Sequence, residues 1–252
     1  MSFLERIVTA RRGAVEELKR NVSVPSNAPA PRDFRAALVA EGMSIIAEIK
    51  RRSPSKGDLN PGLDPVALAR AYERGGARCL SVLTEPEFFS GSTDDLSLAR
   101  SATTLPTLYK DFVLDPVQVL DARRAGADAV LLIVRMVPEG LVDLIAEVRR
   151  WEMCPLVEIF DENDLERALD AGADVVGVNH RDLETFEEDP SATKRLRRIV
   201  PDGVVLVAES AISTRADIEA LEDIGVHAAL VGEALVTSRD PQAKLRELLG
   251  SA

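Results

Sequence analysis

The stretch 120–134, LDARRAGADAVLLIV, joins a polar helix-forming segment, a glycine and a continuous apolar run. Gly126 stands where a helix would end in a left-handed cap, because glycine adopts positive φ without steric cost. The run that follows is short and rich in Val and Leu, which is typical of a strand buried on both faces. This stretch therefore predicts a helix, a tight turn and a buried strand.

The same unit recurs as RAYERGGARCLSVL at 70–83, RALDAGADVVGVN at 167–179 and EALEDIGVHAALVG at 219–232. In these copies Gly76, Gly172 and Gly225 separate the helical part from the apolar run. Repetition of helix, turn and buried strand is typical of a parallel sheet covered by helices.

Eight apolar runs are the predicted strands: Ile45–Ile49, Cys79–Leu83, Thr107–Lys110, Ala129–Val134, Leu156–Ile159, Val175–Asn179, Val204–Ala208 and Ala228–Gly232. Helices are predicted over Asp64–Arg74, Asp94–Ser101, Pro116–Ala125, Glu139–Arg150, Glu162–Ala171, Ala192–Val200, Thr214–Ile224 and Pro241–Leu249. This count over 252 residues predicts an α/β fold, a single (β/α)8 TIM barrel spanning 1–252. An open doubly wound sheet is the alternative, but it would normally carry a glycine-rich dinucleotide fingerprint after its first strand, which is missing.

Residues 1–44 are expected to form an N-terminal extension leading into the first strand. Apolar residues at helical spacing predict a helix over Ser2–Arg20, and the three prolines of Val24–Arg32 predict an extended linker. We expect this extension to act as a lid or plug across one end of the barrel.

The formal net charge is −11, which argues against a nucleic-acid or anionic-membrane partner because their phosphates would be repelled. A small anionic substrate remains compatible, since a local cluster of cations can outweigh distant charges across a Debye length of about 8 Å. The start MSFLERIVTARR does not resemble a signal peptide, and Cys79 and Cys154 are expected to be free, buried thiols. We expect a cytoplasmic protein with no metal and no cofactor.

Ionisable or amide side chains end five of the predicted strands, where barrel enzymes assemble their active sites. They are Glu48 and Lys50 at the end of strand one, Lys110 at the end of strand three, Glu158 on strand five, Asn179 and Arg181 at the end of strand six, and Glu209 with Ser210 after strand seven. Burying one such group is costly unless it is paired or used. We expect these acids and bases to tune one another, with cations left to meet an anionic substrate.

The loops ESAIST and VGEAL follow strands seven and eight, the usual phosphate site of this architecture. His180 is expected to point away from Asn179 and Arg181, because side chains alternate along a strand. The acidic stretch Glu184–Asp189 is interpreted as a solvated loop.

Eight segments occur in order: EIKRRSPSKG (48–57), SVLTEPEFFSGS (81–92), LYKDFVLDPVQ (108–118), LLIVRMV (131–137), LVEIFDENDLERALDAGA (156–173), VGVNHRDLETF (176–186), VAESAIS (207–213) and LVGEAL (230–235). Together they resemble the block motifs of indole-3-glycerol-phosphate synthases over nearly the whole chain. The resemblance implies a carboxy-lyase of tryptophan biosynthesis. Its substrate is an anthranilate-bearing deoxyribulose 5-phosphate, whose indole ring it closes with loss of carbon dioxide and water. Association with other enzymes of that pathway is left open.

The resemblance also implies residue roles. Lys110 would be the general acid at the substrate ketone, Glu158 the base of dehydration, and Lys50 a partner of the substrate carboxylate or a second acid. Residues that would orient these groups and the substrate are Glu48, Asn179, Arg181, Glu209 and Ser210. An apolar pocket for the aromatic ring would comprise Pro54, Phe89, Phe112, Leu131 and Leu183. Ser53, Ala211, Gly232 and Glu233 complete the expected substrate-binding set.

One residue departs from the family pattern: Ala211 stands where the family has glycine after Glu209-Ser210. If that glycine needs positive φ or lets the backbone approach a phosphate, Ala211 weakens phosphate binding.

Three rival interpretations fit these residues less well. A phosphate-binding sugar isomerase would want a Cys or Asp base after strand one and an Asp on strand five, where Lys50 and Glu158 stand. A Schiff-base aldolase would need a lysine on strand six, where Asn179 stands. A barrel kept only as a scaffold is disfavoured because every charged position is present.

Overall fold

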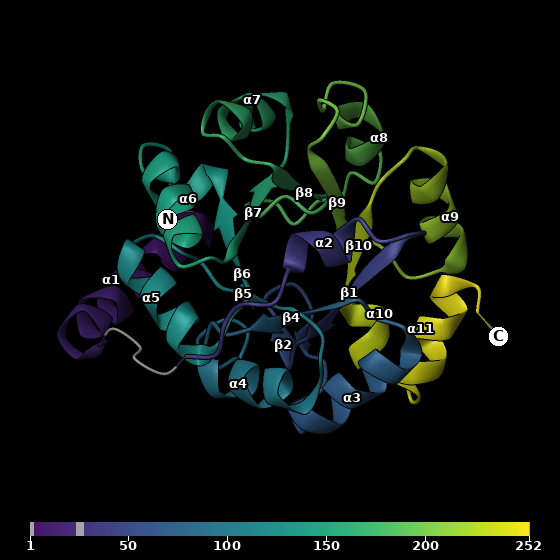
Figure 1. The fold of residues 1–252 in the computed structure, drawn as a ribbon, viewed down its shortest axis with the longest axis horizontal. Helices are drawn as coiled ribbons and strands as arrows, with labels where there is room; N and C mark the ends of the chain where they lie inside the picture. The colour runs from purple at the N-terminus through teal and green to yellow at the C-terminus, as the bar shows by residue number, and fades with distance from the viewer. Residues whose placement is uncertain (1–2, 24–27, 252) are drawn as a thin grey trace.

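Eight parallel strands close into a barrel in the computed structural model, which describes residues 3–23 and 28–251 (Figure 1). Around the barrel the order is β1-β10-β9-β8-β7-β6-β5-β4, so neighbours in the chain are neighbours in the sheet. The strands are β1 (Ser44–Ile49), β4 (Cys79–Leu83), β5 (Thr107–Lys110), β6 (Ala129–Ile133), β7 (Cys154–Ile159), β8 (Val175–Asn179), β9 (Val205–Glu209) and β10 (Ala228–Val231). The predicted (β/α)8 barrel is confirmed.

Helices surround the barrel in Figure 1. They are α3 (Pro65–Gly75), α4 (Thr93–Ala102), α5 (Pro116–Ala125), α6 (Leu141–Arg150), α7 (Glu162–Asp170), α8 (Ala192–Leu196), α9 (Arg215–Asp223) and α11 (Pro241–Leu249). Helices α3, α5 and α11 each begin at an Asp-Pro pair, in which the aspartate side chain accepts backbone N–H groups of the first turn. The glycines predicted to end helices, Gly76, Gly126, Gly172 and Gly225, all have positive φ. The prediction for Ala192–Val200 was too long, since α8 ends at Leu196.

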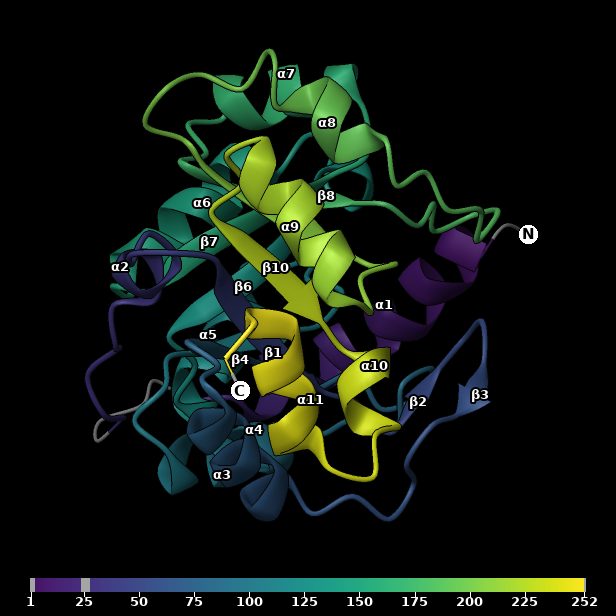
Figure 2. The same ribbon diagram turned by 90° about the vertical axis from the view of Figure 1, so that its right-hand side faces the viewer.

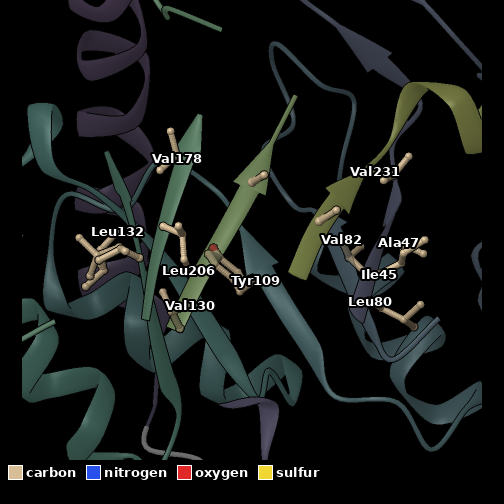
Figure 3. Close-up of a cluster of buried hydrophobic side chains, with 14 of the residues drawn as sticks. Ile45, Ala47, Leu80, Val82, Tyr109, Val130, Leu132, Val178, Leu206 and Val231 are labelled. Atoms are coloured by element: carbon tan, nitrogen blue, oxygen red, sulfur yellow. The ribbon is translucent and has the colours of Figure 1, made fainter. Parts of the chain in front are cut away.

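Side-chain alternation along the strands creates two cores. Ile45, Leu80, Val130 and their counterparts point outward and are buried under the helices (Figure 3). Alternate residues point into the barrel and form a second buried cluster, which includes Ile46 and Leu108. Two residues further along β1, β5, β7 and β9, the same inward phase is occupied by Glu48, Lys110, Glu158 and Glu209, so the interior becomes polar at the C-terminal ends of these strands.

The N-terminal extension covers both ends of the barrel (Figure 2). Helix α1 (Phe3–Asn21) lies at the end toward which the strands point, where Arg11 pairs with Asp111 at 3.1 Å. Helix α2 (Phe34–Leu38) lies at the opposite end, and Ser44 at the start of β1 donates to the Ala37 carbonyl at 3.0 Å. Helix α2 was not predicted, and Ser2 and Val24–Asn27 lie outside the described residues.

Several short elements lie near the C-terminal strand ends. They are the hairpin β2 (Arg52–Ser53) with β3 (Gly57–Asp58), the 3-10 helix η1 (Val134–Met136) and helix α10 (Glu233–Val236). Their length leaves no periodic pattern that could have predicted them. None of the described helices is long and apolar enough to cross a membrane.

Candidate active site

A cavity of about 390 Å³ opens at the C-terminal ends of the strands. It brings together every site residue expected from the sequence. They are Glu48, Lys50, Ser53, Pro54, Phe89, Lys110, Phe112, Leu131, Glu158, Asn179, Arg181, Leu183, Glu209, Ser210, Ala211, Gly232 and Glu233. Residues up to 185 positions apart thus line one surface, because parallel strands end at the same rim.

Lys110 lies between two buried carboxylates at the base of this cavity. Its Nζ is 3.0 Å from Glu158 Oε2 and 3.2 Å from Glu209 Oε2. Burial alone would lower the pKa of Lys110, but Glu158 and Glu209 outweigh it and hold that pKa above the ordinary 10.5. Burial raises the pKa of Glu209 to about 7, although the Lys110 ammonium opposes the shift. The site therefore holds a protonated lysine beside a carboxyl group that titrates near neutrality.

Asn179 links this ion pair to the next loop. Its Nδ2 donates to Glu158 Oε1 at 3.1 Å, and its Oδ1 accepts from Ser210 Oγ at 2.8 Å and from the Arg181 N–H at 3.0 Å. Because both ends of the amide are used, Asn179 fixes the direction in which Glu158 faces.

A second Lys–Glu pair lies at the end of β1, with only β4 between it and β5. Lys50 Nζ is 2.6 Å from Glu48 Oε1, and Ser81 Oγ donates to Glu48 Oε2 at 3.4 Å. Glu48 lies on β1, Lys50 directly follows it, and Ser81 lies on the adjacent strand β4. The side chains of all three point into the barrel. Ser81 is fully buried and was not expected in the site.

Two glycines leave the space that the carboxylates occupy. A Cβ at Gly177 would lie 2.1 Å from Glu209 Oε1, and one at Gly232 would lie 2.3 Å from Glu48 Oε1. Any other residue at these inward positions would displace the carboxylate. Both glycines therefore shape the polar floor of the cavity.

The cavity also has an apolar surface, which we call the aromatic wall. It consists of Pro54, Phe89, Phe112, Leu131 and Leu183, with Leu83, Ile133 and Leu230 beside them. The rings of Phe89 and Phe112 are 5.9 Å apart between centroids and tilted by 48°. This surface suits a planar aromatic group held next to the charged floor.

Two ion pairs lie at the mouth: one joins the loops after β1 and β10, and the other lies within the loop after β8. Lys56 Nζ lies 2.6 Å from Glu233 Oε1, and Arg181 donates through Nε to Glu188 at 3.2 Å. Two sequence expectations are corrected here. The cations lining the cavity, Lys50, Lys56, Lys110 and Arg181, all have carboxylate partners within the described residues, so none is left over. Glu188 is also more than part of a solvated loop, since it lines the cavity.

The loops after β9 and β10 border the cavity through Ser210–Ser213 and Gly232–Ala234. Ser210 and Ala211 have φ of 69° and 53°, in the left-handed region that favours glycine. Ala211 therefore has the positive φ for which the family's glycine would be suited. An alanine in this conformation is strained.

Further cavity residues were missed from the sequence: Ser55, Lys56, Leu83, Glu85, Asp111, Ile133, Phe186, Glu188, Ile212, Ser213, Leu230, Ala234 and Thr237. Strand alternation could have found Leu83, Ile133 and Leu230, which share the inward phase of the expected residues.

Arg135 was quoted in the motif LLIVRMV without a role. It lies at the end of β6 and donates to Asp161 at 2.7 Å, Asp164 at 2.8 Å and Asp182 at 3.1 Å. Its guanidinium also lies 4.5 Å from the Phe160 ring centroid. One side chain thus ties together three successive loops of the catalytic rim.

His180 lies outside the cavity, as expected. Its ring nitrogens are 3.1 Å from the Ser210 carbonyl and 2.6 Å from Thr193 Oγ1, and burial lowers its pKa. Cys79 and Cys154 are free thiols, but only Cys79 is buried. Among the described residues, no group of three His, Cys, Asp or Glu side chains could hold a metal ion.

Fold and site together define a (β/α)8-barrel enzyme. A model of the indole-3-glycerol phosphate synthase family matches residues 4–248. "Indole-3-glycerol phosphate synthase 2" of Streptomyces coelicolor is 48% identical, over 96% of this chain and 94% of its own length. The indole-3-glycerol phosphate synthase of Dehalococcoides mccartyi (strain 195) is 45% identical, over 98% of this chain and 100% of its own. The chain belongs to the indole-3-glycerol phosphate synthase family, and its fold and sequence are those of a carboxy-lyase of tryptophan biosynthesis.

Solved structures at low identity share the barrel alone. KGPDC from Streptococcus mutans has a TM-score of 0.63 at 10% identity, covering 82% of this chain and 96% of that chain. The N-acetylmannosamine-6-phosphate 2-epimerase from Clostridium perfringens has a TM-score of 0.63 at 17% identity, covering 87% and 97%. A shared barrel does not imply a shared reaction.

Proposed function

We propose that this cavity converts 1-(2-carboxyphenylamino)-1-deoxyribulose 5-phosphate into indole-3-glycerol phosphate by ring closure, decarboxylation and dehydration. The observation that supports it most is Lys110, held 3.0 Å from Glu158 and 3.2 Å from Glu209 in a cavity that Phe89, Phe112 and further apolar side chains also line. The reaction needs a proton donor and a base beside a flat aromatic group, and this arrangement supplies all three.

Lys110 acts first, as the general acid at the ketone. The ring carbon that carries the carboxylate attacks the carbonyl carbon at position 2 of the sugar chain, and a new C–C bond forms. The carbonyl π pair moves to oxygen, which takes a proton from the Lys110 ammonium. Glu158 and Glu209 keep that ammonium protonated at neutral pH and stabilise its position.

Carbon dioxide leaves next, once the ring carbon is tetrahedral. The C–C bonding pair returns to the ring and restores its aromatic character, so the step needs only an orienting cation for the carboxylate. Lys50, fixed by Glu48 at 2.6 Å, is that partner or a second acid.

Glu158 is the base of the final dehydration. It removes a proton from carbon 1 of the former sugar chain, and the C–H bonding pair becomes the pyrrole double bond. The hydroxyl on carbon 2 takes a proton from Lys50, acting as the second acid, and leaves as water with the C–O bonding pair. The proton on Glu158 can then return to Lys110, 3.0 Å away. Asn179 holds Glu158 at 3.1 Å in the direction this transfer requires.

The phosphate binds against Ser210–Ser213 and Gly232–Ala234, with backbone N–H groups as donors. The two ion pairs at the mouth then exchange partners: the substrate's anionic groups replace Glu233 on Lys56 and Glu188 on Arg181. Both pairs are partly exposed, and exposed pairs are worth only about 0–1 kcal/mol, so the exchange is easy.

One assay tests the function. The protein is incubated with the carboxyphenylamino-deoxyribulose phosphate without added metal, and indole fluorescence is followed with time. Fluorescence should appear together with carbon dioxide, and a wild-type protein that yields neither would refute the function. A cytoplasmic location, the absence of nucleic-acid and membrane partners, and association with other enzymes of the pathway stay predictions from the sequence.

A further inference from the structure

The loop after β4, residues 85–92, is organised around one buried carboxylate. Glu85 is 1% exposed. Its Oε1 accepts the N–H of Glu87 at 2.9 Å, and its Oε2 accepts those of Phe88 at 2.6 Å and Phe89 at 3.1 Å. Three successive backbone groups therefore converge on a single side chain.

The backbone of Glu85 closes the same loop. Its carbonyl accepts the Gly91 N–H at 2.8 Å. A Cβ at Gly91 would lie 2.2 Å from the Leu83 carbonyl, so the chain returns tightly onto the end of β4. Ser90 completes the turn with a left-handed φ of 55°. The loop has little freedom while the Glu85 carboxylate holds it.

What this loop presents to the cavity is the aromatic wall. Phe88 is buried in the second apolar cluster, and Phe89 lines the cavity with its ring centroid 5.9 Å from that of Phe112. The position of the Phe89 ring follows from its own backbone, and the N–H of that backbone is one of the three that Glu85 holds.

A carboxylate is the side chain this loop requires. Hydrogen bonds to an ionised acceptor are shorter and roughly twice as strong as neutral ones. Glutamine has the same shape but only one acceptor oxygen, and its NH2 group would face an N–H donor. Replacing Glu85 by Gln should therefore loosen the loop while conserving its volume.

We propose that Glu85 is a positioning residue that sets the aromatic wall through Phe89 and so determines which ring systems the cavity accepts. Glu85 lines the cavity, but both of its carboxylate oxygens are occupied by the loop, so it acts through Phe89. The inference rests on the proposed function, because that function puts the anthranilate ring against this wall.

The test is a cycle of Glu85→Gln, Phe89→Ala and the double variant. Each single variant should raise KM about tenfold with kcat within about threefold, as expected for lost ring binding. The double variant should be no worse than Phe89→Ala alone, because both act on one ring. Glu87→Gln is the matched control: its side chain is exposed in the same loop, and its KM should equal that of the wild type.

Ring selectivity and binding give independent readouts. Wild type should discriminate against a substrate with a methyl group on the anthranilate ring, and Glu85→Gln should reduce that discrimination. Anthranilate alone, titrated by NMR, should bind Glu85→Gln several-fold more weakly than wild type, whether or not turnover occurs. If the wild-type protein does not form indole-3-glycerol phosphate, the proposed function is refuted. The anthranilate affinities test the positioning role independently of turnover.

Multiplicative effects in the double variant, or unchanged anthranilate affinity in Glu85→Gln, would overturn the proposal. Circular dichroism and thermal unfolding check that each variant is folded at the assay temperature. If Glu85→Gln does not fold, Glu85→Asp replaces it. That variant keeps the charge but shortens the side chain, and it should raise KM less than Phe89→Ala does. An unchanged KM in Glu85→Asp would then count against the proposal.

Discussion

Lys110 and Glu209 form a buried ion pair of 3.2 Å, and Glu158 holds the same ammonium at 3.0 Å from another strand. The lysine end of β5 thus depends on β7 and β9, which are not its neighbours in the sheet. Charges so deeply buried are stable only while all partners remain, because a lone buried charge is costly.

Loss of the proposed general acid or of the proposed base should lower kcat strongly. Lys110→Ala or Glu158→Gln should lower kcat by roughly 10²–10⁴, the range for losing a general acid or base. The steady-state rate of indole-3-glycerol phosphate formation measures it, with Lys194→Ala as a control on an exposed face of α8. Near-wild-type turnover in either variant contradicts the assigned roles.

The rate should depend on pH through Glu209 and Lys110. Burial raises the Glu209 pKa to about 7, so the carboxylate that faces Lys110 is protonated as the pH falls through that value, and the rate should fall with it. Burial lowers the Lys110 pKa, but the carboxylates raise it above 10.5 overall, so the alkaline loss should begin only beyond pH 10.5. Single-turnover fluorescence isolates the chemical step. A rate independent of pH between about 5 and 10 speaks against Glu209, and a rate that falls on the alkaline side below about pH 10 speaks against Lys110 as the group lost there.

Ala211→Gly should improve substrate binding. Ala211 has a φ of 53°, and relieving a left-handed alanine is worth about 1 kcal/mol. KM should fall several-fold with kcat little changed, because phosphate contacts are remote from the reacting bonds.

Ala220→Gly is the opposite control for this variant. Ala220 is exposed within α9, where glycine costs about 1 kcal/mol, so its melting temperature should fall while that of Ala211→Gly rises. An unchanged KM in Ala211→Gly would show that the loop tolerates its methyl group.

Gly177→Ala should lower activity by displacing the Glu209 carboxylate. The new Cβ would lie 2.1 Å from Glu209 Oε1, so the carboxylate must move away from Lys110. We expect kcat to fall at least about tenfold, because a displacement of about 1 Å costs that much or more in an enzyme site. Gly140→Ala is the matched control, since no atom lies within 4 Å of its added Cβ. Equal kcat in the two variants would contradict the claim that Gly177 leaves the space that the Glu209 carboxylate needs.

The barrel and the position of its site were predictable because both depend on local patterns. Continuous apolar runs identified β4, β5 and β8 to the residue, and glycines marked the helix ends. The strand that carries Glu209 was predicted one residue early, since the apolar run stops at Ala208 while the ladder continues.

Pairing among the charged groups was not predictable. Glu188 and Glu233 neutralise Arg181 and Lys56 across 7 and 177 residues, and no spacing rule relates such partners. The same holds for Glu85, whose buried carboxylate accepts hydrogen bonds from backbone N–H groups of its own loop. Strand periodicity gives the direction of a side chain, whereas its partner depends on where the loops fold back.

The two helices of the N-terminal extension, α1 and α2, are synthesised before several of the residues that they contact. Helix α1 docks through Arg11 on Asp111 and through Lys19 on Asp115, at 3.1 and 2.8 Å. Arg35 of α2 donates to the Gly203 carbonyl at 3.0 Å. On the ribosome, α1 therefore emerges before Asp111 and Asp115 have been made, and the contact between α2 and Gly203 forms later still. Both helices are made before the last strands of the barrel, so their contacts with Asp111, Asp115 and Gly203 can form only as the later part of the chain folds.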